Sequence, residues 1–102
     1  MKTAVKTSAK TVAVGIRPEI DYPKAGETIT SREYTFRVGA PETAEEVGVS
    51  IDQGPWQTCR NAAGYWWYDW SGYDTGAHEI IARSRAKKGR WLVSAVRKLV
   101  VE

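Results

Sequence analysis

Cysteine and histidine are nearly absent from this sequence, which contains one of each, Cys59 and His78. A single cysteine cannot form a disulfide within the chain, and one cysteine with one histidine cannot supply a zinc site. A nucleophile–base pair would need Cys59 or a serine beside His78. Because His78 follows a glycine turn at the start of a predicted strand, we expect its ring to pack and bind a loop. The sequence therefore predicts no enzyme, no catalytic residues and no cofactor.

Calcium is the remaining metal to consider, because it prefers oxygen ligands. Asp52, Asp69 and Asp74 would have to meet at one end of the molecule, and their spacing is not that of a calcium loop. Glycine-rich phosphate-binding motifs are also absent. We therefore expect no metal site and no nucleotide site.

Long apolar runs are missing as well, so the sequence predicts neither a membrane span nor a signal peptide. Residues 1–10 are small, polar and basic, and we expect them to form a flexible leader before a single domain over 11–102. As written, the chain is expected to be soluble, cytoplasmic by default and extracellular if it belongs to a longer exported protein.

The charge is too modest to favour nucleic acid as the partner. The net charge is +3, with basic residues concentrated near the two ends and most acidic residues in the middle. A duplex would be repelled by this acidic middle, whereas solvated strand faces explain the basic stretches. Nucleic acid is therefore not expected to bind.

Alternation of apolar and polar residues with a period of two is the main structural signal, and it predicts strands. Turn-forming residues at 22–27, 52–55, 61–64 and 87–90 separate these strands. No stretch has a helical period with caps. The predicted strands lie near 11–16, 34–38, 46–51, 56–60, 65–70, 78–85 and 91–101. The pattern is typical of an all-β antiparallel sandwich.

The aromatic segment 65–70 is the most informative of these strands. Trp66, Tyr68 and Trp70 share one face of an extended chain, whereas Tyr65 and Trp67 share the other. We predict that the first three side chains fill the core and that the other two face outward.

Three motifs follow one another along the chain: the turn PKAG at 23–26, the hairpin VGVSIDQG at 47–54 with Trp56 after it, and the strand GAHEIIARS at 76–84. In this order they resemble the motifs of bacterial immunoglobulin-like domains. The resemblance covers about residues 16–101, and the aromatic strand and the closing segment 94–101 fit the same order. The chain is more distantly similar to the immunoglobulin-like dimerisation domain of sulfite-oxidase-type molybdenum enzymes, which is also non-catalytic. One departure is Ala86, where the family commonly has an aspartate.

The resemblance implies an immunoglobulin-like antiparallel β-sandwich of about seven strands. Members of this family mostly act as spacers, adhesion modules or accessory domains, so the resemblance implies more about fold than about function.

Tyr65 and Trp67 are the candidate binding residues, with Arg83 and Arg85 expected alongside on an outward strand face. Exposed aromatic residues mark binding sites more often than chance exposure does. We therefore predict a non-catalytic interaction or accessory module that contacts another protein or forms a homodimer. The alternatives are a carbohydrate-binding module that uses an exposed Trp/Tyr platform, and a purely structural role in which other segments cover these rings.

Overall fold

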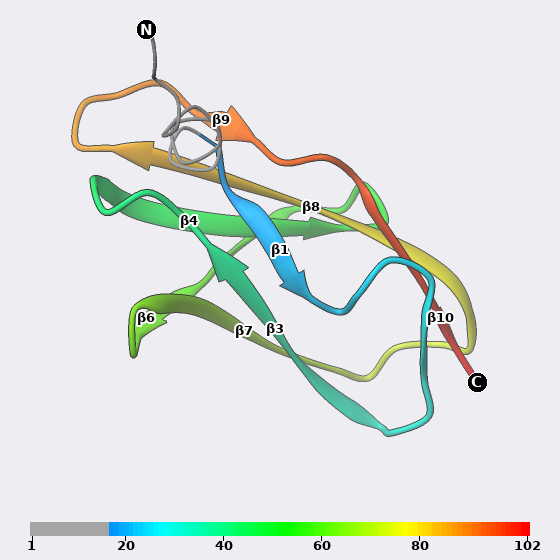
Figure 1. Cartoon of the computed structure of the whole chain (residues 1–102). Helices are drawn as coiled ribbons and strands as arrows, with labels where there is room; N and C mark the ends of the chain where they lie inside the picture. Colours follow the sequence, from blue (N-terminus) through cyan, green and yellow to red (C-terminus); the bar gives the residue numbers. More distant parts are fainter. Residues whose placement is uncertain (1–16) are drawn as a thin grey trace, which may run out of the picture.

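The computed structural model describes residues 17–102, in which every regular element is a strand (Figure 1). The predictions for residues 1–10 and for a first strand over 11–16 lie outside the described residues. The strands are β1 (Glu19–Tyr22), β2 (Glu27–Ile29), β3 (Glu33–Gly39), β4 (Ala44–Ile51), β5 (Trp56–Thr58), β6 (Arg60–Ala62), β7 (Tyr65–Ser71), β8 (Gly76–Ala86), β9 (Leu92–Val93) and β10 (Arg97–Val101).

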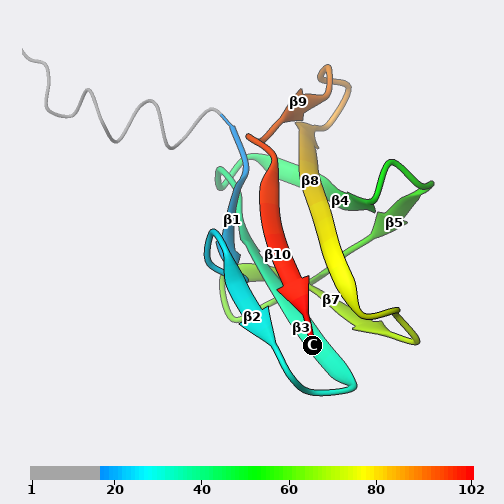
Figure 2. The same cartoon turned by 90° about the vertical axis from the view of Figure 1, so that its right-hand side faces the viewer.

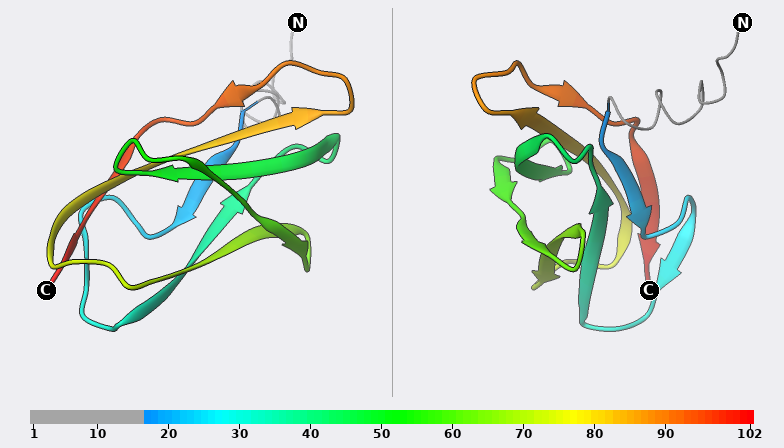
Figure 3. Two further views of the ribbon diagram at one scale, coloured as in Figure 1. Left: turned by 180° about the vertical axis from the view of Figure 1, so that it is seen from behind. Right: turned by 60° about the vertical axis from the view of Figure 1, so that its left-hand side comes forward.

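These strands form two sheets that pack face to face as two layers (Figure 3). The first sheet has the order β1-β3-β7-β6, and the second has the order β2-β10-β8-β4-β5 with β9 paired to β8. Figure 2 shows β10 between β2 and β8 in the second sheet. The β2–β10 pair is parallel, whereas the other pairs among the described residues are antiparallel.

The ten strands correspond to seven segments, three of which are interrupted. Between β1 and β2, and between β5 and β6, the chain leaves one sheet and joins the other. Between β9 and β10, buried Ser94 exchanges hydrogen bonds with Ala82, which replaces the regular ladder. The predicted fold, an all-β immunoglobulin-like sandwich of about seven strands, is confirmed.

The core lies between the layers and contains the alternate side chains that the sequence pattern assigned to it. Trp70 is buried, and Trp66 and Tyr68 pack against the core from the same side of β7. The predicted inward face of this strand is therefore correct. The other buried apolar residues are Ile20, Ile29, Phe36, Val38, Val47, Val49, Cys59, Ile80, Ala82, Leu99 and Val101.

Several strand boundaries differ from the sequence prediction. Strands β1 and β2 were not predicted, and the predicted strand 91–101 is divided into β9 and β10. The predicted return strand 56–60 is split between β5 and β6, which belong to different sheets. The predicted loop 61–64 is shorter, because β6 includes Asn61 and Ala62 and pairs with β7 through a two-residue turn. Ala63 and Gly64 at this turn have φ values of 55° and 82°, as a type I′ hairpin requires.

Candidate functional site

Tyr65 and Trp67 lie on the outer face of the first sheet, as their alternation with the core residues of β7 predicted. The ring centroids of Tyr65 and Trp67 are 6.1 Å apart and nearly perpendicular. The guanidinium carbon of Arg37 lies 4.2 Å from the Tyr65 ring centroid and 4.7 Å from that of Tyr22. Tyr22, Arg37, Tyr65 and Trp67 together form what we call the β7 patch.

Polar contacts hold the β7 patch in place. The indole Nε1 of Trp67 donates a hydrogen bond to the carbonyl oxygen of Ala62 at 2.9 Å, and Arg37 pairs with Asp21 at 3.2 Å. Tyr65 is 36% exposed and Trp67 is half-buried. The rings are thus oriented by the protein itself while part of their surface remains in contact with water.

An ion pair borders the patch on the same outer face. Arg60 binds the carboxylate of Asp69 at 2.7 Å, and the hydroxyl of Thr35 donates to the same carboxylate. These hydrogen bonds, first from Arg60 and then from Thr35, lower the pKa of Asp69 below its ordinary value. Asp69 is therefore ionised at neutral pH and is paired with Arg60.

Arg83 and Arg85 do not lie alongside Tyr65 and Trp67, contrary to the sequence prediction. They project from β8 in the second sheet, and the connection from β7 to β8 crosses from one layer to the other. Side chains that point outward from the two strands therefore reach opposite faces of the sandwich. Alternation tells inward from outward, but it does not tell which sheet a strand joins.

On their own face, the two arginines interleave with two tryptophans that sequence reasoning had not selected. The guanidinium carbon of Arg83 lies 4.3 Å from the Trp56 ring centroid and 3.9 Å from that of Trp91. The guanidinium carbon of Arg85 lies 4.4 Å from Trp91. We call these four residues the Trp–Arg stack. The one sequence signal for it was the glycine at 48 within a strand, which marks a close approach to the backbone.

Gly48 makes room for this stack. It pairs with Arg83 across the β4–β8 ladder and has no side chain on the outer face. A Cβ at Gly48 would lie 3.0 Å from the carbonyl oxygen of Gln57 and 3.9 Å from the Trp56 ring. The indole of Trp56 can therefore lie close to the backbone of β4.

Replacing Gly48 with alanine is expected to destabilise the fold by about 1 kcal/mol, at the low end of overpacking effects. The new methyl group would press on the β5 backbone and shift Trp56 relative to Arg83. Chemical denaturation would measure the loss, and near-ultraviolet circular dichroism would report the environment of the indoles. Gly39→Ala is the matched control, because the nearest atom there would be 3.4 Å away, a side-chain oxygen of Asp21. An equal loss in both variants would contradict this explanation.

His78 connects three segments at one end of the sandwich. Its Nδ1 lies 2.6 Å from Oδ2 of Asp52 and its Nε2 lies 2.7 Å from the carbonyl oxygen of Asp74. The other carboxylate oxygen of Asp52 accepts a hydrogen bond from the backbone N–H of Glu79. The imidazole also packs edge-on against Trp70, with centroids 5.1 Å apart. The ring is thus packed and bound to loops, as the sequence analysis expected.

Both ring nitrogens of His78 face acceptors, which favours the doubly protonated imidazolium. Burial opposes the charge, but the hydrogen bonds that the ring donates to the Asp52 carboxylate and the Asp74 carbonyl outweigh it and raise the pKa of His78 above its ordinary value. Burial also raises the pKa of the Cys59 thiol to about 12, so this group is not a thiolate at neutral pH. Neither group is set up as a general base or nucleophile.

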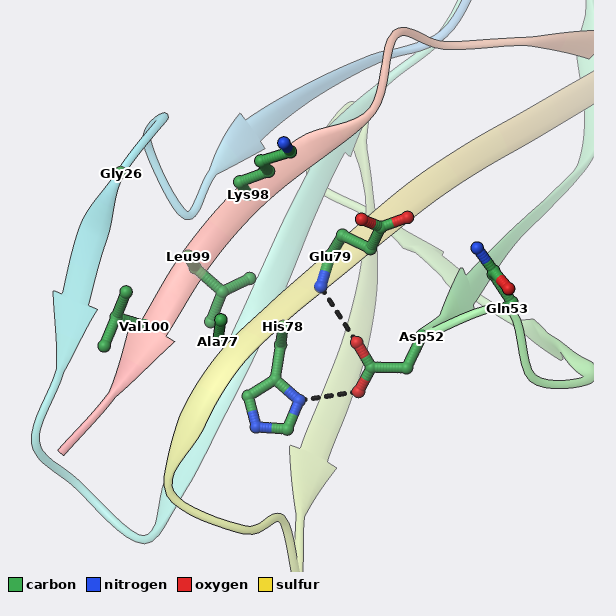
Figure 4. A pocket seen from close by; sticks show the side chains of 9 residues that line it. All are labelled: Gly26, Asp52, Gln53, Ala77, His78, Glu79, Lys98, Leu99 and Val100. Atoms are coloured by element: carbon green, nitrogen blue, oxygen red, sulfur yellow. Dashed lines mark hydrogen bonds and ion pairs between the residues drawn. The ribbon is translucent and has the colours of Figure 1, made fainter.

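Beside His78 lies an open groove of about 480 Å³ on the second sheet (Figure 4). Lys98 and Glu79 are cross-strand partners in it, and Ala77 and Val100 add apolar surface. Within residues 17–102, no group of three or more histidine, cysteine, aspartate or glutamate residues is placed to hold a metal ion. The described part of the chain also has no helix long and apolar enough to cross a membrane.

The comparisons with solved structures agree on the fold. The chain is similar to fibronectin(III)-like modules of Clostridium thermocellum CbhA, with 21% identity, a TM-score of 0.70, and 82% of this chain and 93% of that chain covered. It is also similar to an engineered protein, with 21% identity and a TM-score of 0.68 over 83% of this chain and 20% of that chain.

The third similar structure is a modular endo-β-1,4-mannanase from Cellulomonas fimi, with 19% identity and a TM-score of 0.64. The alignment covers 83% of this chain and 18% of the mannanase chain, so the likeness involves one part of a larger protein. The fold is that of fibronectin(III)-like modules. This sandwich is immunoglobulin-like in the broad sense, and no protein-family model or curated protein matches its sequence. The more specific resemblance to bacterial immunoglobulin-like domains stays a prediction.

Proposed function

We propose that this domain is a non-catalytic interaction module that contacts another protein, or a second copy of itself, through the β7 patch. The observation that carries the proposal is the partly exposed cluster of Tyr22, Tyr65 and Trp67 beside Arg37. Tyrosine, tryptophan and arginine are enriched at protein interfaces and supply most of the binding energy there. The contacts of Trp67 with Ala62 reduce the side-chain entropy lost on binding.

Carbohydrate is the second candidate ligand of the same patch. Similarity to a module of a mannanase favours it, as does the rigid placement of the Trp67 ring. Against it, the guanidinium of Arg37 stacks on Tyr65, whereas a sugar needs a free ring face. We therefore rank protein contact first.

Truncation of the patch tests the proposal. Trp67→Ala and Tyr65→Ala are each expected to weaken self-association, or binding to a protein partner, by at least tenfold, because interface anchors contribute about 2 kcal/mol or more. Light scattering coupled to gel filtration over a range of concentrations would measure self-association. Val100→Ala is the control, since Val100 is similarly exposed (40%) but lies on β10 at the outer face of the second sheet, outside both the β7 patch and the Trp–Arg stack.

Carbohydrate binding has a separate measurement. Retardation of the wild-type protein in gels containing mannan or cellulose, with loss of that retardation in Trp67→Ala, would favour the second candidate. A protein that stays monomeric, binds no protein partner and ignores both polysaccharides would contradict the proposed role of the β7 patch.

A further inference from the structure

We propose that the Trp–Arg stack is a second binding surface, on which Arg83 anchors a carboxylate from an acidic segment of a partner protein. This surface lies on the opposite outer face from the β7 patch, so the inference goes beyond the proposed function and does not depend on it. It rests on the hydrogen bonding of Arg83 and on the apolar surface beside it.

The guanidinium of Arg83 lacks an acceptor in the described part of the chain. Its Nε is buried without a hydrogen-bond partner, although guanidinium N–H groups are strong donors. Its neighbour Arg85 differs, because Glu46 accepts a hydrogen bond from it. Because protein atoms enclose Nε, a ligand would reach Arg83 through the terminal guanidinium nitrogens, which also have no acceptor among the described residues.

The stack also determines how a ligand can approach Arg83. The guanidinium of Arg83 lies over the rings of both Trp56 and Trp91, so these indoles occupy part of the space around it. A carboxylate approaching in the guanidinium plane avoids the indoles and can form the two parallel hydrogen bonds by which arginine binds carboxylates. The indoles would also shield this ion pair from water.

Apolar surface lies next to Arg83. A hollow of about 200 Å³ is lined by residues including Ser50, Ile81 and Val96. Val96 is 50% exposed, and Val93 opposite Arg83 is 39% exposed. Ile81 and Arg83 are two residues apart on one face of β8, so they lie roughly 7 Å apart along the strand. An extended segment would match this spacing if its carboxylate and an aliphatic side chain were also two residues apart.

The charge around the stack favours a protein segment over a polyanion. Nucleic acids and sulfated polysaccharides need several unpaired cations, because each phosphate or sulfate contact adds a small gain. Here Arg85 is paired with Glu46, and Glu79 projects from the same face of β8. Within the Trp–Arg stack, Arg83 has the guanidinium that no acidic side chain pairs with, and its place beside an aliphatic hollow fits one carboxylate beside one aliphatic side chain.

Selection from a random heptapeptide library displayed on phage, with the full chain as bait, tests the inference. Recovered peptides are expected to be enriched for Asp or Glu two positions from Leu, Ile or Val. Synthetic copies of these peptides should bind Arg83→Gln and Arg83→Lys at least tenfold more weakly than wild type, since lysine keeps the charge but loses the planar fork. Arg90→Gln removes the same charge from the exposed β8–β9 turn and should bind as wild type does.

Three outcomes would overturn the inference: no enrichment, enriched peptides that bind Arg83→Gln equally well, or equal losses in Arg83→Gln and Arg90→Gln. Heparin or an oligonucleotide could instead bind more tightly than the selected peptides do. If that affinity falls steeply as salt is added, the surface is a general basic one and the inference is wrong. Thermal unfolding of each variant would show that it is folded. Trp67→Ala should leave peptide binding unchanged, so this inference and the proposed role of the β7 patch can fail separately.

Discussion

Replacing Trp70 with alanine is expected to lower the free energy of unfolding by about 3–5 kcal/mol, the usual loss for a large buried aromatic side chain. Trp70 is 7% exposed and stacks on Tyr73 with ring centroids 3.8 Å apart. Its centroid also lies 5.3 Å from that of Phe36 in the core. Truncation would leave a cavity between the sheets and remove these aromatic contacts. Urea denaturation followed by fluorescence or circular dichroism would measure the loss.

Trp67→Ala is the matched comparison, because it removes the same side chain from the outer face of the same strand. We expect a far smaller loss, about 1 kcal/mol, which corresponds to one hydrogen bond to Ala62 and partial burial. Greater destabilisation by Trp67→Ala than by Trp70→Ala would mean that the two faces of β7 are exchanged, as a one-residue slip in register would produce.

Replacing Asp52 with alanine is expected to cost about 2–3 kcal/mol, because the carboxylate binds both the His78 ring and the backbone N–H of Glu79. These contacts stabilise the β4–β5 turn, where Asp52 and Gln53 have φ values of 52° and 64°. Urea denaturation at pH 6 would measure it. Asp74→Ala is the control, because Asp74 contacts His78 through its backbone carbonyl, and its side chain can be removed without loss of that bond.

The same interaction should make stability depend on pH. Because the pKa of folded His78 is raised, its contribution is fully present below about pH 6.5, the unfolded value, and is lost as pH rises through the folded pKa. The difference in unfolding free energy between wild type and His78→Gln should therefore shrink as the pH increases above 6.5. Nuclear magnetic resonance titration of the imidazole would give the folded pKa directly, and a value below 6.5 would contradict the assignment.

Alternation along the chain predicted much of this fold correctly. Tyr34, Phe36 and Val38 mark β3, and the pattern at 47–51 with the following turn marks the β4–β5 hairpin. Such local signals are reliable because the extended chain places successive side chains on opposite faces, one of which must be buried. The turn after β4 was also readable, since its aspartate, glycine and proline favour chain reversal.

Strand ends and sheet changes were harder to predict from the sequence. The chain passes Cys59 and moves from the second sheet to the first within a few residues, where one continuous strand was expected. Cys59 is itself buried, so its apolar character resembles that of any core strand residue. Whether its neighbours pair with β4 or with β7 depends on which strand is nearby in space, and no local pattern records that.

The candidate site divides in the same way. The outward direction of Tyr65 and Trp67 followed from their alternation with the core residues of β7. Which residues of other strands lie beside them could not be predicted in this way. Arg37 reaches both Tyr22 and Tyr65 because β3 lies between β1 and β7 in one sheet. In the other sheet, Trp56 on β5 reaches Arg83 on β8 across the intervening β4, and Trp91 reaches it because the next residues form β9, which pairs with β8. Except for Trp91, which lies across one hairpin turn from Arg83, these neighbours are far apart in the sequence.

By itself, then, the sequence determined that the chain is made of strands, which side of each strand is buried, and where most turns lie. All three depend on neighbours along the chain, through the two-residue period and the φ preferences of a few residues. Only the tertiary structure decided which strands share a sheet, and with that the separation of the β7 patch from the Trp–Arg stack. Strand pairing depends on backbone hydrogen bonds and core packing between segments that are distant in the sequence. Every strand has the same backbone donors and acceptors, so no local pattern identifies its partner.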